Sequence, residues 1–384
     1  MSAAAISDPG GSDPDAVIAV AGGGIAGAAC CLALAKAGRA VTWLAPPLPD
    51  AARPGESLAA AAVPLLARLG LAHLLDHPAH RRAAVSFTAW GSDALLESSA
   101  IARPGGMGHV IDRGRLEADL AAAAGCRPEV RLIDDSLADF ARADGHWQVE
   151  TSGGQRLRAG FLVDATGRAA AIGRRLAAQK RADRLIAAYA FLEQTDDGID
   201  PTPATLVEAV RDGWWYATLL ADRRLAVNFY SDPDLMPAGL ARDPAAWRRM
   251  IAESRYIARW VETGGLEIGG PPQLTGAGTA WLDQAAGPGW MAVGDAAAAL
   301  DPLSAHGMTT ALWTGIEAAR ALCRAQDGDP AALPAYADRV LRGVERYRID
   351  RQRIHLAESR FAGAPFWQRR TRHHDAAAGL AAHA

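Results

Sequence analysis

The sequence predicts an α/β protein in which a parallel sheet, split along the chain, accompanies a separate antiparallel sheet. Three observations predict this fold. A strand, a glycine-rich turn, a helix and a second strand follow one another within residues 16–44. Four strand patterns without intervening helices lie between residues 184 and 231, and a second glycine-rich segment precedes a long helix at residues 290–325. Strands joined by helices pair in parallel, whereas consecutive strands joined by turns pair antiparallel.

The first element carries a dinucleotide-binding pattern, GGGIAG at Gly22–Gly27, between an apolar strand and a helix of small residues. Gly22 would make the tight turn, Gly24 would let the backbone approach a pyrophosphate, and Gly27 would let helix and strand pack closely. Ala26 lies in the same segment. The helix N-terminus supplies unpaired N–H groups and the positive end of the helix dipole.

The same stretch differs from the fingerprint at one position. An acidic residue for the ribose hydroxyls is expected about 20 positions on, near Leu44 or Ala45, and neither side chain accepts a hydrogen bond. Residues 16–35 are also uncharged, so a membrane helix is an alternative. Three adjacent glycines and an acidic N-terminal flank argue against that alternative and against a signal peptide.

The next segment, Arg53-Pro-Gly-Glu-Ser57, predicts a turn before a helix over residues 58–69, interrupted by Pro64. Glu56 and Ser57 could act as an N-terminal cap. A further helix is predicted over residues 116–124, and Arg113 begins it.

Strands dominate the middle of the chain. A hairpin over 146–163 leads into Asp164-Ala-Thr-Gly167, and four strands are predicted at 184–194, 205–210, 214–220 and 225–231. Alternation places Trp214 and Tyr216 on one face and Trp215 on the other. Aromatic residues on strands belong to the core more often than to a pocket, but we expect at least one of the three to line a substrate cavity.

The second glycine-rich segment follows a short buried strand at 290–293 and contains Asp295, Pro302, Gly307 and Met308. Asp295 can accept a hydrogen bond from a ribityl hydroxyl. The helix beginning near Gly307 directs its positive end at a group such as an isoalloxazine, which becomes anionic on reduction. The two glycine-rich segments therefore predict the two ends of one FAD site. His306 is the only ionisable side chain of LSAHGM, and we consider it a candidate for proton transfer.

Composition narrows the function classes. The chain has 384 residues, of which 22% are charged, and a formal net charge of −3, which gives no basic excess for nucleic acid. The four cysteines show neither metal-ligand nor disulfide spacing, so we expect no metal site, a reducing compartment and a cytoplasmic protein. Residues 1–15 are predicted to form a disordered tail. The arginine-dense segment 335–361 predicts a helix whose arginines form a solvated face or dock an acidic partner.

These motifs resemble a family. GGGIAG, Asp164-Ala-Thr-Gly-Arg168 and Gly294-Asp295 with Asp301-Pro302 resemble the FAD-contacting motifs of aromatic hydroxylases with a glutathione-reductase-like fold. The segments RPGESL at 53–58, WGS at 90–92, WWY at 214–216, DPLSAHGM and FWQRR at 366–370 resemble the flavin-dependent halogenase-like branch. Within that branch, the chain is most similar to monooxygenases that modify peptidyl tryptophan during tryptophylquinone biogenesis, from residue 17 to residue 370.

The resemblance implies a fold, a reaction and site residues. It implies a discontinuous FAD-binding domain (16–78, 105–182 and 277–326), an inserted substrate domain (79–104 and 183–276) and a C-terminal helical segment (327–384). It implies that a flavin C4a-hydroperoxide hydroxylates an electron-rich aromatic ring. The implied ring is that of a tryptophan in a peptide or protein subunit. It places Arg53, Glu56, Ser57 and Arg113 around the flavin. Electrons would come from NAD(P)H or from a separate flavin reductase.

Three other functions remain open. Tryptophan-type halogenases need a lysine at the place of residues 81–85 and a W-x-W-x-I-P motif, and this chain has neither. Its only lysines are Lys36 and Lys180. A reductase of the isoprenoid type shares the Gly-Asp-Ala motif and an aromatic strand, and a non-catalytic FAD-bearing maturation chaperone would use the same fold. Relatives often carry Gln where this chain has His306, so hydrogen bonding there is as good an interpretation as acid–base catalysis.

Overall fold

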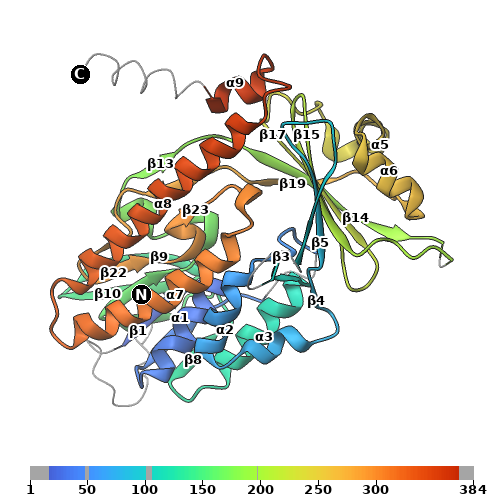
Figure 1. The fold of residues 1–384 in the computed structure, drawn as a ribbon. Helices are drawn as coiled ribbons and strands as arrows, with labels where there is room; N and C mark the ends of the chain where they lie inside the picture. The colour runs from blue at the N-terminus through green and yellow to red at the C-terminus, as the bar shows by residue number, and fades with distance from the viewer. Residues whose placement is uncertain (1–16, 48–51, 101–105, 197, 372–384) are drawn as a thin grey trace, which may run out of the picture.

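The computed structural model describes residues 17–47, 52–100, 106–196 and 198–371, so the predicted tail at 1–15 lies outside the described residues. The chain folds around two sheets that lie at opposite ends of the molecule and are bridged by a long C-terminal helix (Figure 1). Within the described ranges, no helix combines the length and apolar character needed to cross a membrane.

The first sheet has six strands in the order β21-β22-β12-β1-β2-β8. Five of them pair in parallel, and β21 is antiparallel to β22. The bounds are β1 Ile18–Ala21, β2 Val41–Leu44, β8 Val130–Ile133, β12 Phe161–Asp164, β21 Ala286–Gly287 and β22 Trp290–Ala292. The predicted nucleotide-binding unit is confirmed, and strands far apart in sequence complete its sheet.

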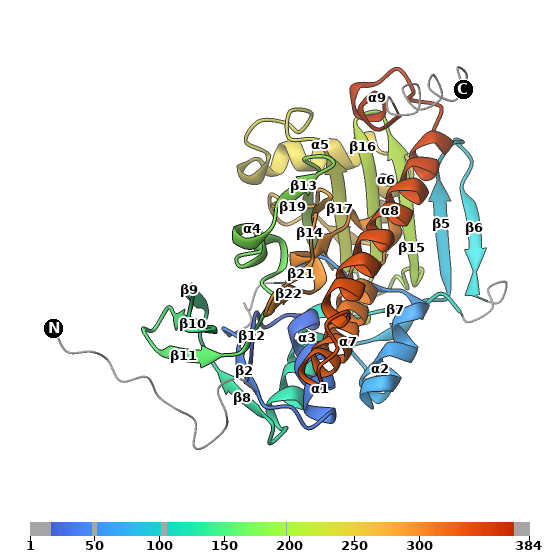
Figure 2. The same ribbon diagram turned by 90° about the vertical axis from the view of Figure 1, so that its left-hand side faces the viewer.

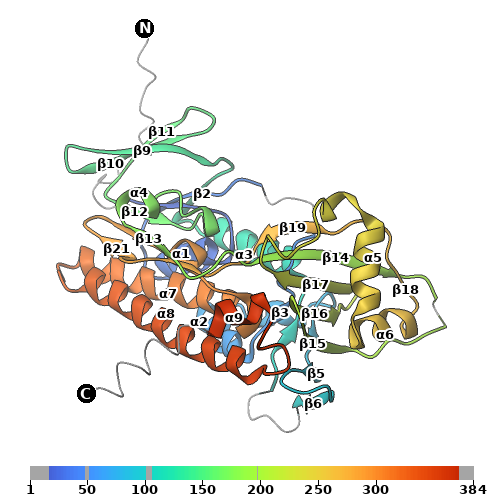
Figure 3. The same ribbon diagram turned by 90° about the horizontal axis from the view of Figure 1, so that it is seen from above.

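Helices and a three-stranded meander lie on opposite sides of this sheet (Figures 2 and 3). The helices are α1 Ile25–Lys36, α3 Arg113–Gly125 and α7 Gly307–Gln326. The meander consists of β9 Leu137–Ala143, β10 His146–Thr151 and β11 Arg156–Ala159. The predicted hairpin is therefore β10 with β11, and β12 returns the chain to the parallel sheet.

Small residues let α7 and the segment before it pack directly on α1. A Cβ added at Gly315 would lie 2.6 Å from the Ala26 carbonyl oxygen, and one at Gly294 would lie 2.7 Å from the Ala26 Cβ. Thr314 Oγ1 accepts a 2.8 Å hydrogen bond from Gly294 N, which fixes the turn against α7. The two glycine-rich segments predicted to share one site are thus in contact.

The second sheet has eight strands, in the order β18-β14-β17-β16-β15-β5-β6 with β19 also paired to β14. Its pairs are antiparallel except β15 with β5. The four strands predicted in the middle of the chain are confirmed as β14 Ile186–Gln194, β15 Ala204–Val210, β16 Gly213–Leu219 and β17 Leu225–Ser231. The others are β5 Val85–Ala89, β6 Leu96–Ser99, β18 Leu266–Glu267 and β19 Gln273–Gly276.

One face of the second sheet is covered by α5 Pro244–Glu253 and α6 Tyr256–Thr263 (Figure 1), two helices that the sequence analysis did not anticipate. We call this the outer face. It carries Trp215, Val227 and Phe229, which share a core with Trp247 and Ile257. The opposite, inner face carries Trp214, Tyr216 and Tyr230.

The predicted C-terminal helix at 335–361 is instead two helices, α8 Ala332–Ala357 and α9 Pro365–Thr371. Helix α8 runs from the first sheet to the second (Figure 1). Tyr336 Oη donates a 2.7 Å hydrogen bond to the Ala292 carbonyl at the first sheet. Trp367 Nε1 donates a 2.9 Å hydrogen bond to the Val210 carbonyl at the second. The C-terminal helices therefore hold the two sheets together.

Two other helix predictions have different outcomes. The helix expected over 58–69 is β3 Ser57–Leu58 followed by α2 Val63–Leu69. Pro64 lies in the first turn of α2, where its missing N–H removes no hydrogen bond, so the proline begins this helix rather than interrupting it. The helix predicted over 116–124 with Arg113 at its start is confirmed as α3, and Asp112 caps it by accepting from Arg115 N at 2.9 Å.

Short elements complete the chain. A small sheet joins β3 to β7 His109–Val110 and β4 Arg81–Arg82. Another joins β13 Gln179–Arg181, β20 Ala280–Leu282 and β23 Ala298–Ala299. The remaining helix is α4 Gly173–Leu176. Short 3-10 turns connect several of these elements. They include η1 Ala60–Ala62, η4 Gly167–Ala169, η6 Gly294–Ala296 and η7 Pro302–Ser304.

Candidate functional site

The N-terminal glycines divide into those required by the protein's own packing and one that faces open space. Gly22 has φ +125°, and a Cβ there would lie 2.1 Å from the Ala165 carbonyl oxygen. A Cβ on Gly27 would lie 2.1 Å from the Gly22 carbonyl oxygen. Trp43 Nε1 holds the same turn by donating to the Gly22 carbonyl at 3.0 Å. Around Gly24, at the N-cap of α1, an added Cβ would meet nothing described within 4 Å.

This arrangement fits the pyrophosphate of a dinucleotide. The first hydrogen bond of α1 joins Ala28 N to the Gly24 carbonyl at 3.0 Å, so the N–H groups of residues 25–27 precede the helical ladder. Those donors and the helix dipole attract an anion, and the absence of a side chain at Gly24 lets it approach. Ala26 is 8% exposed and packs below this turn, so its contribution to a ligand is through its backbone.

The Asp164 carboxylate at the end of β12 is fully used inside the protein. It accepts hydrogen bonds from Thr166 N at 2.9 Å and Thr166 Oγ1 at 2.6 Å, and from Ile172 N at 2.9 Å and Gly173 N at 2.7 Å. Arg168 Nη1 donates to the Gly278 carbonyl at 2.5 Å, and its Nη2 reaches the second glycine-rich segment and donates to the Leu300 carbonyl at 3.0 Å. The Asp164–Arg168 motif therefore shapes and tethers the loop beside the site.

Asp295 and Asp301 have different surroundings despite belonging to one predicted motif. The Asp295 side chain is 37% exposed and lies 3.5 Å from Arg168 Nε. Loss of hydration raises the pKa of Asp295, and the positive charges of Arg168 and Arg113 oppose that rise. Asp301 is 1% exposed, accepts from Leu303 N at 2.8 Å and lies 3.1 Å from Arg351 Nε of α8. Asp295 is thus accessible to a ligand, while Asp301 anchors the loop to α8.

The start of α7 is built as a ligand-facing terminus. Ala305 has φ +53°, a conformation that is uncommon for a residue with a side chain and is frequent at functional sites. His306 follows as the exposed N-cap residue, and an added Cβ at Gly307 would meet nothing described within 4 Å. Pro302 begins η7, and Met308 is 9% exposed and packs into the core. The backbone N–H groups at this terminus are therefore open to a ligand, as at α1.

Two predicted cofactor arginines converge on a buried carboxylate that the sequence analysis missed. Glu117 on α3 is 2% exposed and forms ion pairs with Arg53 and with Arg113, the second at 3.0 Å. Arg113 Nη1 also donates to the Pro54 carbonyl at 2.6 Å. The spacing of Arg113 and Glu117, four residues apart on one helix, was the available signal. Glu117 positions both arginines beside the RPGES segment.

Glu56 lies between this arginine cluster and the inner face of the second sheet. It is 3% exposed, and burial raises its pKa, while backbone hydrogen bonds and the charge of Arg113 lower it. The Tyr216 hydroxyl is close enough for the negative charge of Glu56, after burial itself, to raise the pKa of Tyr216. Ser57 is also near that hydroxyl. The structure therefore brings Glu56, Ser57 and Tyr216 together.

The three aromatic residues predicted for the substrate have three different places. Trp215 lies on the outer face against Trp247, with ring centroids 5.2 Å apart, and so faces away from the other two. Trp214 stacks on Tyr230 at 4.0 Å and packs near the α9 end of the inner face. Tyr216 alone borders the polar region beside Glu56.

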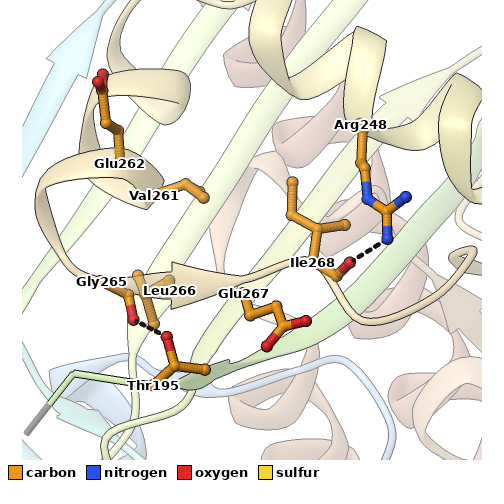
Figure 4. A pocket seen from close by; sticks show the side chains of 8 residues that line it. All are labelled: Thr195, Arg248, Val261, Glu262, Gly265, Leu266, Glu267 and Ile268. Carbon is orange, nitrogen blue, oxygen red and sulfur yellow. Dashed lines mark hydrogen bonds between the residues drawn. The ribbon is translucent and has the colours of Figure 1, made fainter.

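Two recesses open on the second sheet. One of about 440 Å³ lies between α6 and β18 (Figure 4), where Arg248 donates to the Ile268 carbonyl at 3.0 Å and Thr195 to the Gly265 carbonyl at 3.2 Å. Those polar groups hold the loop itself, and the recess lies on the side of α6, away from Glu56. The other, of about 460 Å³, is lined by Tyr189, Phe191 and Gln273. It adjoins the inner face, because Tyr189 and Phe191 pair with the inner-face positions Asn228 and Ala226 of β17.

The comparisons with known proteins agree with this geometry. Residues 106–383 match the family described as tryptophan halogenase. The chain belongs to the tryptophan halogenase family. A curated relative from Marinomonas mediterranea, the putative FAD-dependent oxidoreductase LodB, is 27% identical over 294 residues, which are 73% of this chain and 76% of the relative.

Solved structures share the fold. The peptidyl tryptophan dihydroxylase QhpG, essential for tryptophylquinone cofactor biogenesis, has a TM-score of 0.76 at 24% identity, covering 94% of this chain and 79% of QhpG. The myxobacterial chondrochloren halogenase CndH has a TM-score of 0.81 at 20% identity, covering 95% and 89%. The flavin-dependent halogenase CmlS has a TM-score of 0.79 at 23% identity, covering 92% and 67%. The protein is thus an FAD-dependent, halogenase-like enzyme of the monooxygenase class.

Proposed function

We propose that this flavoenzyme hydroxylates an electron-rich aromatic ring, namely a tryptophan within a peptide or protein. The observation that carries the proposal is the inner face of the second sheet. There an acidic and phenolic centre, Glu56 with Tyr216, is walled by stacked aromatic rings such as Trp214 on Tyr230. The similarity to a peptidyl tryptophan dihydroxylase over most of the chain supports the same substrate class.

The residues present fit FAD. The open α1 terminus at Gly24 would hold the pyrophosphate, and the accessible Asp295 carboxylate would accept from the ribityl chain. The open α7 terminus at Gly307 would lie against the isoalloxazine, with Arg53 and Arg113 at its border. When bound and reduced, FAD supplies activation of molecular oxygen. We propose NAD(P)H or a separate flavin reductase as the source of electrons.

The protein's own groups would then bind and orient the ring and keep water away. Trp214, Tyr230 and the α9 cluster close one end of the inner face. His306, exposed at the start of α7, is our candidate to accept the proton that the ring loses on substitution. This role remains a prediction.

Halogenation is the second candidate, because the family and several solved neighbours are halogenases. The placement of basic residues disfavours it. Arg81 begins the segment 81–85, where the resemblance implies a lysine in tryptophan halogenases, and it donates from Nε to the Leu219 carbonyl at 3.0 Å and from Nη1 to the Pro203 carbonyl at 3.1 Å. Lys36 is exposed on α1 and donates to the Arg68 carbonyl at 3.0 Å. Lys180 is exposed on β13.

Product mass separates these reactions. The FAD-loaded enzyme is supplied with a flavin reductase, NADH, oxygen, chloride and bromide, and is offered a tryptophan-containing peptide or free tryptophan. We expect the peptide to gain 16 or 32 mass units in steps of one oxygen atom, and free tryptophan to be a poor substrate. A chlorine or bromine isotope pattern would establish halogenation instead, a gain of 2 would indicate reduction, and turnover-free peptide binding would indicate a chaperone.

Loss of the cofactor tests the site directly. Gly24→Asp places a carboxylate at the open α1 terminus, where it clashes with and repels a pyrophosphate. We expect the purified variant to be folded but colourless, measured by flavin absorbance after denaturation. Gly343→Asp, on the exposed surface of α8, where an added Cβ also meets nothing described within 4 Å, is the matched control and should keep a full complement of FAD. Normal flavin content in Gly24→Asp would refute this site.

A further inference from the structure

Polar atoms without partners gather on the inner face of the second sheet. Asn228 on β17 is 1% exposed, and both its Oδ1 and Nδ2 have no hydrogen-bond partner in the described part of the chain. The same holds, within the described ranges, for Tyr216 Oη and Glu56 Oε1. Ser57 and Thr218 approach the Tyr216 hydroxyl without completing a hydrogen bond of normal geometry.

These atoms belong to one row across the sheet. Asn228 pairs with Tyr216 on β16 and with Tyr189 on β14, so the three side chains stand side by side on the inner face. Tyr189, at the edge of the row, lines the recess of about 460 Å³. The row therefore runs from an opening at β14 to the place where Glu56 approaches Tyr216.

Burial of an amide without hydrogen bonds costs stability, typically about 1–3 kcal/mol. Native proteins leave few such groups, and the exceptions need an explanation. On the inner face Asn228 lies between Ala226 and Tyr230 along its own strand and beside Tyr216 and Tyr189 on the neighbouring strands, and its amide has no hydrogen bond to any described residue. The unpaired amide therefore points to a ligand that supplies hydrogen bonds here.

We propose that Asn228, with Tyr216 and Glu56, binds the N–H edge of an indole ring. This inference rests on the proposed function and names how its substrate is recognised. An indole offers one donor on an otherwise apolar ring. Asn228 Oδ1 would accept from that N–H, and Asn228 Nδ2 would donate to Glu56 Oε1 or to the Tyr216 hydroxyl, which can act as donor or acceptor. The neighbouring aromatic rings would contact the apolar part of the indole. Asn228 is then a specificity-determining residue, because a ring without the N–H leaves its amide unpaired.

The test combines a change in the substrate with a change in the protein. Peptides carrying tryptophan or 1-methyltryptophan are compared as substrates of the FAD-loaded enzyme. For the unmodified enzyme we expect kcat/KM to favour the tryptophan peptide by roughly ten- to a hundredfold, the range for an unpaired buried polar group. In Asn228→Leu the preference should fall to near one, and in Tyr216→Phe it should fall partway, with FAD content unchanged in both.

Thr205→Val is the matched control on the same face. It removes a hydroxyl that pairs with Thr218 Oγ1 at 2.9 Å, while Thr218 keeps its 3.2 Å hydrogen bond to the Ala204 carbonyl. This variant should retain the full preference. An unchanged preference in Asn228→Leu, with normal flavin content, would overturn the inference and leave Asn228 a structural residue.

Binding provides the second readout, so that the inference and the proposed function can fail separately. Dissociation constants of the two peptides are measured on the oxidised, FAD-loaded protein, where no reaction occurs. Loss of discrimination in Asn228→Leu supports the subsite even if the turnover product carries a halogen rather than oxygen. Oxygenated product with equal affinities for both peptides in the unmodified enzyme would sustain the proposed function and overturn the subsite.

Discussion

The two faces of the eight-stranded sheet treat buried polar groups in opposite ways. On the outer face, Glu208 is 4% exposed and accepts from Arg255 N at 2.7 Å, Tyr256 N at 3.0 Å and Ile257 N at 3.0 Å. On the inner face, Asn228 is more deeply buried and has no such partner among the described residues. A buried polar group that satisfies the backbone builds the fold, whereas one left unpaired is available to a ligand.

Adjacent tryptophans on β16 follow the same division. Trp215 packs between Phe229 at 4.7 Å and Trp247 at 5.2 Å and completes the core under α5 and α6. Trp214 stacks on Tyr230 at 4.0 Å and faces Trp90 at 6.4 Å, at the junction with the C-terminal helices. The outer face therefore forms a hydrophobic core with α5 and α6, whereas the inner face is the side of the sheet that faces the flavin-binding half.

The largest effect on stability should come from the outer face. Glu208→Ala leaves the first N–H groups of α6 without their acceptor and removes a favourable charge from the helix N-terminus. We expect the free energy of unfolding to fall by about 3 kcal/mol, measured by urea denaturation. Glu262→Ala, at the exposed C-terminal end of α6, is the control and should change it by less than about 0.5 kcal/mol. Equal effects would show that Glu208 is not the anchor of α6.

The next largest expected effect is on the pH dependence of stability, and it involves the aromatic cluster at the end of the inner face. His355 is 1% exposed between Trp90 at 6.3 Å and Trp367 at 6.0 Å. Burial lowers the pKa of His355, and the positive charges of Arg351 and Arg370 lower it further. The folded protein therefore keeps this imidazole neutral at a pH where the unfolded chain, with a histidine pKa near 6.5, binds a proton.

The sign follows from that difference in protons bound. Stability contributed by neutral His355 is present above about pH 6.5 and is lost as the pH falls, with a slope of at most about 1.4 kcal/mol per pH unit. His355→Phe should remove this part of the slope between pH 6.5 and 5, as measured by thermal or urea unfolding at several pH values. Identical slopes for the two proteins would mean that His355 is protonated in the fold.

A substitution on the inner face should change the free energy of unfolding by less, and in the opposite direction to Glu208→Ala. Asn228→Leu replaces an unpaired amide by an apolar side chain of similar size. We expect the free energy of unfolding to stay the same or to rise by up to about 1 kcal/mol, while substrate discrimination is lost. A fall of 2 kcal/mol or more would show that the amide has structural partners, and the contrast between the two faces would then fail.

Sequence patterns predicted the parts of this molecule that local rules govern. Glycine roles at Gly22 and Gly27 follow from turn geometry and close packing, and the structure shows carbonyl oxygens where their side chains would be. The face alternation of Trp214 and Trp215 follows from the two-residue period of a strand, and it is confirmed. Helix α5 could also have been predicted, because Asp243 followed by Pro244 is a typical helix N-terminus. In the structure the Asp243 side chain caps the helix by accepting from Ala246 N at 2.9 Å.

The features that the sequence did not predict depend on contacts between segments that are distant along the chain. Glu117 lies 64 positions from Arg53, and nothing in either local pattern predicts their ion pair. Asn228 is conspicuous in the sequence only as a polar residue inside a mostly apolar strand, and such residues usually find a partner in the fold. Its lack of a partner becomes visible only when all neighbouring strands are in place. Cofactor motifs are therefore more predictable than substrate-recognition residues.

Substitution of an exposed arginine on α8, a helix that is not part of either face of the sheet, should have the smallest effect on stability. The sequence left open whether its arginines dock an acidic partner. In the structure many of them have intramolecular partners: Arg339 with Glu317, Arg342 with Asp338, Arg348 with Glu345, Arg351 with Asp183 and Asp301, and Arg353 with Asp350.

Exposed pairs such as Arg342 with Asp338 contribute little, because solvent and salt screen them, whereas the Arg351 pairs are buried. Arg342→Ala should therefore change the free energy of unfolding by less than about 0.5 kcal/mol. It should also leave KM for an acidic tryptophan peptide unchanged at low and high salt, since Arg342 is already neutralised by Asp338. A rise in KM of more than roughly threefold at low salt that disappears at high salt would place the docking surface on α8, and substrate selection would then rest on charge outside the sheet as well as on the inner face.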